Sequence, residues 1–193
     1  SGKHNPGDSR DRQIDHFPES ARLLLLQLSR TWQVPVTLVE LKANQRARHR
    51  PKLDPDEAAL RQACSLRCRR LRSCMGELAR NFGPVRPDDP LVRLVPCPSS
   101  PETRTLLAAP IWRAEDVECF VVCGCLPGAF RQVPVARIRG DKPEGPVLAP
   151  TACINGKTRM QFVRYFAHLS QTMEDALTTY FNRDALVRKV AQQ

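Results

Sequence analysis

The feature that most constrains the fold is a long amphipathic helix predicted over residues 54–83. Pro55 at the first helical position needs no hydrogen bond, Asp54 can cap the free N–H groups, and Gly83 can take the left-handed conformation that ends a helix. Apolar side chains recur at steps of three and four, which places them on one face: Leu60, Cys64, Cys68, Leu71, Met75, Leu78 and Phe82. We expect this helix to pack centrally against a second layer.

Positive charge is concentrated in this helix and in the loop before it. Residues 42–80 contain eleven Lys/Arg and four Asp/Glu, in a chain with a formal net charge of +10. A local excess indicates an acidic partner better than a uniformly basic composition does, although a GC-rich gene also raises Arg content without any function. Because Arg can contact phosphate with two parallel hydrogen bonds, the predicted nucleic-acid contacts are Arg46, Arg48, Arg50, Lys52, Arg69 and Arg72.

The rest of the chain predicts an α+β fold in a single domain. Residues 1–15 are a polar tail, and residues 16–193 divide into a helical part (16–83), a β-rich part (84–140), a loop (140–156) and a helical part (157–193). A first helix is expected over residues 21–32, and strands near 33–40, 91–95, 105–112, 117–125 and 132–139. Short links make neighbouring strands antiparallel. The expected architecture is an antiparallel sheet of about four to five strands, packed against the central helix and the C-terminal helices.

A second apolar stripe runs along the C-terminal helical part. Phe162, Phe166, Met173 and Tyr180 recur at helical spacing, and residues 182–184 are expected to break the helix before a last short one. Such a stripe covers either the core or a partner. These four residues are therefore the predicted partner-binding residues if the stripe is exposed.

The cysteines indicate reduced thiols rather than disulfides or a metal site. The chain has eight cysteines, no apolar signal segment and no Cys-x-x-Cys pair. Cys119, Cys123 and Cys125 share one parity of a predicted strand, where cysteine acts as a small hydrophobe. A zinc site or a Cys123–Cys125 redox pair is the less favoured alternative. We therefore expect no metal, no cofactor, and a nuclear or cytoplasmic location.

The sequence offers no catalytic signature. Asn155-Gly156-Lys157-Thr158 is similar to the end of a phosphate-binding loop, but Thr151 stands where that motif needs glycine, so Thr158 is better explained as a helix cap. Two of the four histidines lie in or near the polar tail, His49 lies in the basic loop, and His168 is expected to be a partly solvated residue of the last long helix. Glu174-Asp175 are typical of surface charges. No apolar run reaches membrane-spanning length. We expect neither an enzyme nor a membrane partner.

Two functional hypotheses remain. The first is a non-enzymatic basic module that binds nucleic acid through the Arg-rich loop and helix. The chain begins with Ser-Gly rather than Met, so we expect the module to be part of a larger nuclear or chromatin-associated protein. Few aromatic residues lie in that region, which favours duplex over single strand. The alternative is a protein-interaction or oligomerisation domain that uses the C-terminal helix, with the basic charge only steering association towards an acidic protein surface or a second copy.

Overall fold

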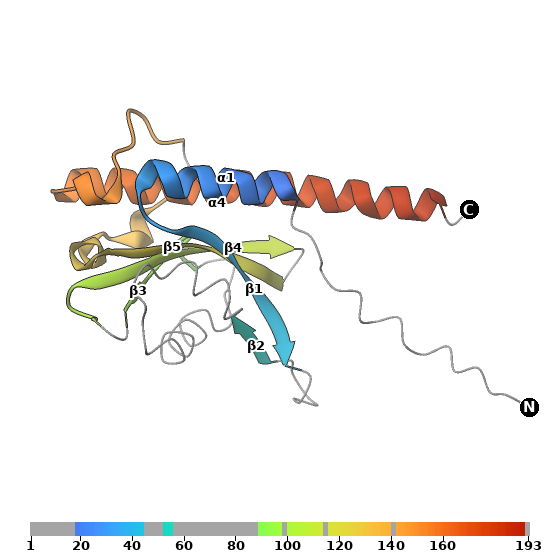
Figure 1. The fold of residues 1–193 in the computed structure, drawn as a ribbon, viewed down its shortest axis with the longest axis horizontal. Helices are drawn as coiled ribbons and strands as arrows, with labels where there is room; N and C mark the ends of the chain where they lie inside the picture. The colour runs from blue at the N-terminus through green and yellow to red at the C-terminus, as the bar shows by residue number, and fades with distance from the viewer. Residues whose placement is uncertain are drawn as a thin grey trace, which may run out of the picture.

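The fold is a five-stranded antiparallel sheet with two long helices on one face. The computed structural model describes residues 18–44, 52–55, 89–97, 100–113, 116–139 and 142–191. The strands are β1 (Val36–Asn44), β2 (Lys52–Pro55), β3 (Arg93–Pro96), β4 (Arg104–Arg113) and β5 (Asp116–Pro127), in the order β2-β1-β5-β4-β3. The helices α1 (Glu19–Trp32) and α4 (Gly156–Ala191) lie together across the sheet (Figure 1). The predicted α+β class is confirmed. Residues 56–83 of the expected central helix lie outside the described residues, but its expected start was wrong, because Asp54 and Pro55 end strand β2 and pair with Lys42 and Leu41.

Strands β4 and β5 form the centre of the sheet. They pair from Arg104 with Pro127 to Arg113 with Asp116, and β5 pairs on its other side with β1. β1 is long enough to pair with β5 through Val36–Glu40 and with β2 further along. Every residue from Thr105 to Ile111 in β4 is buried. Since successive side chains point to opposite faces of a strand, both faces of the sheet's centre are covered.

Two sequence predictions about secondary structure were wrong. Residues 132–139 are not a strand: the chain forms short 3₁₀ helices at Gly128–Gln132 (η1) and Val135–Arg137 (η2), and later at Pro150–Ala152 (η3). Pro134 between them lacks the N–H that a strand ladder needs. The expected helix break at residues 182–184 is also absent, because α4 continues through them to Ala191. Asn and Asp disfavour a helix interior only weakly.

A β-bulge near the end of β5 changes which face its side chains occupy. Thr105 pairs with Leu126 but Leu107 pairs with Cys123, so two residues of β5 stand opposite one of β4. Cys125, at the bulge, has a φ of 40°. Cys123 and Leu126 both belong to the core under the helices, whereas Cys125 does not. The prediction that Cys119, Cys123 and Cys125 lie on one face of the strand is therefore wrong for Cys125.

Aromatic side chains join the helices to the end of the sheet. Phe162 of α4 packs edge-on against Trp32 of α1, with ring centroids 4.9 Å apart, and against Phe130 of η1, at 5.7 Å. All three side chains are buried, with at most 3% of their surface exposed. Edge-to-face contacts at these distances add to the free energy of burial. The cluster fixes α1, η1 and α4 relative to one another.

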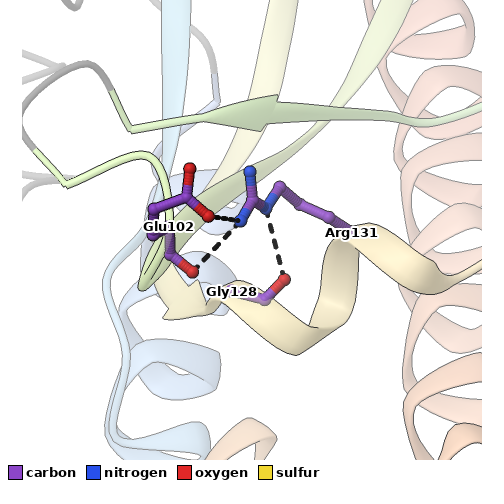
Figure 2. Close-up of polar contacts among 3 residues, drawn as sticks. All are labelled: Glu102, Gly128 and Arg131. Carbon is purple, nitrogen blue, oxygen red and sulfur yellow. Dashed lines mark hydrogen bonds and ion pairs between the residues drawn. The ribbon is translucent and has the colours of Figure 1, made fainter.

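A polar contact holds η1 against the loop between β3 and β4. Figure 2 shows Arg131 donating from Nη2 to the carbonyl oxygen of Glu102, at 3.1 Å, and from Nε to that of Gly128, at 3.4 Å. The Gly128 N–H in turn donates to the Thr103 carbonyl at 2.8 Å. A Cβ at residue 128 would collide with the Glu102 carbonyl oxygen and lie 3.1 Å from two backbone carbons. Only glycine fits this close approach.

Replacing Gly128 by alanine should therefore destabilise the fold. We expect Gly128→Ala to lower the free energy of unfolding by roughly 1–3 kcal/mol, because backbone atoms must move apart to admit the methyl group. Gly156→Ala is the matched control, since a Cβ there would meet nothing within 4 Å. Urea denaturation of both variants measures the difference. Equal stability of the two variants would contradict the close approach at Gly128.

The end of β4 is tied to α4 through a carboxylate. Trp112 lies beyond the last β4 residue that pairs with β3, and its N–H donates to Glu174 Oε2 at 3.0 Å. Partial burial raises the pKa of Glu174 above its ordinary value, the Trp112 hydrogen bond opposes the shift, and nearby Asp175 adds to it. The prediction that Glu174 is a surface charge was therefore wrong, because its carboxylate is partly buried and accepts the hydrogen bond of the Trp112 N–H.

The raised pKa of Glu174 predicts a pH-dependent effect of neutralising it. The folded state binds this proton more tightly than the unfolded state, so the group's contribution to stability falls as pH rises through its pKa. Glu174→Gln keeps an oxygen acceptor for Trp112 without the charge. We expect the Glu174→Gln variant to have a higher thermal midpoint than wild type at about pH 7.5. The difference between the two midpoints should shrink towards about pH 4, where the wild-type carboxylate becomes protonated. Glu174→Ala, which leaves the N–H unpartnered, should be less stable than wild type at both pH values. A Gln effect independent of pH would show that the charge is not the cause.

Candidate functional site

The residues predicted to contact nucleic acid lie almost wholly outside the described part of the chain. Arg46, Arg48, Arg50, Arg69 and Arg72 fall in residues 45–51 and 56–88, which the structure does not describe. Lys52 is the first residue of β2, where its backbone pairs with that of Asn44. Since only Lys52 of the six is described, their role in nucleic-acid binding stays a prediction.

Most of the residues predicted to bind a partner through α4 belong to the core. Phe162, Phe166 and Met173 are 1%, 0% and 4% exposed, because the first half of α4 lies over the sheet. Tyr180 is 42% exposed and lies where α4 leaves the body of the domain. The stripe thus covers the core over most of its length, and only its C-terminal end is accessible.

Exposed apolar side chains that periodicity alone did not identify lie on α1 and on the last part of α4. Within the described ranges, nine large apolar side chains are exposed, and seven of them are on these two helices. They are Leu23, Leu24 and Leu26 on α1, and Tyr180, Leu186, Val187 and Val190 on α4. We call residues 178–191 the free end of α4, since every described side chain there is exposed except half-buried Phe181. Figure 1 shows this segment, in red, continuing past the start of α1.

A groove between the two helices leads onto the free end. It has a volume of about 340 Å³, and its walls are mainly apolar. Pro18, Ala21 and Leu24 line it from α1 and the residue before it. The wall formed by α4 includes Leu169, Met173, Ala176 and Tyr180. Exposed apolar patches of this kind are typical of protein-interaction sites.

A second cavity, at the other end of α4, is polar and basic. It has a volume of about 420 Å³, and four of its lining side chains are cationic. Arg137 and Arg139 come from η2 and the residues after it, Lys142 from the following loop, and Arg164 from α4. Sequence reasoning missed this cluster because its members are spread over residues 137–164 and form no local charge run. Only the pair Arg137 and Arg139 hinted at it.

The five cysteines in the described ranges are all buried. They are Cys97, Cys119, Cys123, Cys125 and Cys153. Burial, with a smaller contribution from Cys125, raises the pKa of Cys123 far above its ordinary range. Redox chemistry and zinc binding both need the thiolate, whose formation at Cys123 is disfavoured by this burial. No group of three His, Cys, Asp or Glu side chains is placed to hold a metal within the described ranges.

The segment similar to a phosphate-binding loop forms a helix cap. Asn155 Oδ1 accepts from the Thr158 N–H at 2.9 Å, and Thr158 Oγ1 accepts from the Asn155 N–H at 3.3 Å. This reciprocal pair satisfies two donors at the start of α4. The capping residue is thus Asn155, not Thr158 alone as the sequence suggested.

None of the helices within the described ranges combines the length and apolar character needed to span a membrane. Comparison of the chain with protein-family models, curated proteins and solved structures finds no match.

Proposed function

We propose that this chain is a non-enzymatic interaction module that pairs with a second copy of itself through α1 and the free end of α4. The observation that carries the proposal is the continuity between the groove and the exposed apolar side chains beyond it. The apolar face of α4 is buried in its first half and exposed at its C-terminal end, which supports the docking of a partner at that end. Nucleic-acid binding through the Arg46–Arg72 region receives no comparable support from the described residues.

Side chains on α4 follow coiled-coil spacing from the groove to the end of the helix. We call them the seam, and they recur at alternating steps of four and three residues. The seam consists of Leu169, Met173, Ala176, Tyr180, Arg183, Val187 and Val190. The first four line the groove, while Val187 and Val190 are 58% and 65% exposed. The seam therefore continues beyond the point where α1 can cover it.

The free end gains little stability from packing against the described part of the chain. Residues 178–191 span about 21 Å at 1.5 Å per residue. Isolated helices of about this length are marginal in water, and stability in proteins comes mainly from packing an apolar face. Leu186, Val187 and Val190 have no such packing within the described chain, since each is more than half exposed. A helical partner would supply it.

A second copy fits the seam in an antiparallel orientation. With the two-fold axis between residues 181 and 182, Met173 meets Val190 of the second copy, Ala176 meets Val187, and Tyr180 meets Arg183. Apolar residues of each free end then enter the apolar groove of the other copy, and the guanidinium lies against an aromatic ring. A parallel pair would instead place Arg183 against Arg183, with like charges in the seam. Antiparallel pairing is therefore the form we propose.

Sedimentation equilibrium over a range of protein concentrations tests this pairing. Wild-type protein should show a monomer–dimer equilibrium, and Val187→Asp should raise the dimer dissociation constant by about tenfold or more, because it buries an unpaired charge in the contact.

The matched control is Thr178→Asp, which places the same charge on the opposite side of the same helix, away from the seam. It should leave the dissociation constant nearly unchanged. A monomeric mass at every concentration, or an equal effect of the two substitutions, would overturn the proposal.

A further inference from the structure

Among the described residues, the lining of the basic cavity beside the start of α4 carries more positive than negative charge. It includes three Arg side chains, one Lys side chain and one carboxylate, that of exposed Glu144. Within the described ranges, neither Arg137, Lys142 nor Arg164 forms an ion pair with a carboxylate. Gathering like charges around a hollow costs stability unless an anion fills it.

The walls of the cavity belong to segments of defined structure, while its four cationic side chains are exposed. Arg137 is the last residue of η2, and Arg164 belongs to α4, whose neighbouring Val163 and Phe166 are buried in the core. Gln161, one turn before Arg164, donates from Nε2 to the backbone carbonyl of Glu144 and so ties the loop to the helix. The three segments that carry the cations are thus held in place by packing and by this hydrogen bond.

We propose that this cavity binds a compact phosphate-bearing anion with two or more negative charges, of the diphosphate class. Guanidinium groups match phosphate oxygens with paired hydrogen bonds, and several cations can share two adjacent phosphates. A volume of about 420 Å³ is within the range of small-molecule sites. None of the described residues that line it is aromatic, so the proposed recognition rests on charge and not on stacking of a base. The site is independent of the proposed self-association.

The proposal is tested by calorimetric titration with sodium pyrophosphate, at low salt and again at higher salt. Pyrophosphate should bind more tightly than inorganic phosphate, and its affinity should fall as salt rises. Arg137→Gln and Arg164→Gln should each weaken binding by about tenfold or more, since each removes a charge-assisted contact. Lys189→Gln is the matched control, because it removes one positive charge from the far end of the same helix and should leave the affinity unchanged.

Thermal melts of each variant verify that these exposed substitutions leave the fold intact. A parallel titration with a short DNA duplex separates a small-ligand site from part of a nucleic-acid surface. Pyrophosphate affinity no higher than that of inorganic phosphate, or a loss of affinity in the Lys189→Gln control equal to that in the two Arg variants, would overturn the proposal. The proposal would also be overturned if the protein bound the DNA duplex through Arg137 and Arg164 but did not bind pyrophosphate.

Discussion

Phe162 lies between two aromatic rings, Trp32 and Phe130, that come from segments far apart in the sequence. This contact joins the first helix, the turn after β5 and the last helix, so it determines where α4 crosses the sheet. Both proposed sites depend on that crossing. The basic cavity forms where the beginning of α4 meets the segment after η2, and the groove forms where α1 leaves the later part of α4 uncovered. Loss of the Phe162 packing would displace both.

The sequence predicted the elements whose signals are local. The sequences of β4 and β5 are rich in apolar residues and are separated by a short polar stretch, and α1 and α4 have apolar stripes at helical spacing. The existence of these elements and the antiparallel pairing of the two strands could therefore be expected. The failures have physical causes. Val133 and Ile138 are β-branched and buried, which resembles a strand, but Pro134 prevents a ladder there. The bulge before Leu126 depends on pairing with β4, which no pattern within β5 reveals. The sequence of residues 182–184 resembles a helix break, yet the unfavourable free energy of placing Asn and Asp inside a helix is too small to end α4.

The candidate sites were less predictable than the fold because each is assembled by tertiary contacts. The apolar stripe of α4 was visible in the sequence, but its spacing could not distinguish buried Phe166 from exposed Val187. That distinction depends on how far the sheet and α1 extend along the helix. The cavity brings Arg137 and Arg164 together across 27 positions of the chain. A charge-run analysis favours the concentrated basic stretch near residues 42–80 and cannot find a composite cluster of this kind.

The unequal covering of α4 implies a gradient of protection against amide hydrogen exchange along one uninterrupted helix. Amides near Phe162 and Phe166 lie over the buried centre of the sheet, so their exchange requires global unfolding of the domain. Amides near Leu186 and Val190 belong to helix that packs on nothing in the described chain, so they exchange by local fraying. The same secondary structure therefore includes some of the slowest and some of the fastest helical amides of the molecule, and binding at the free end would be recorded as slowed exchange in that segment.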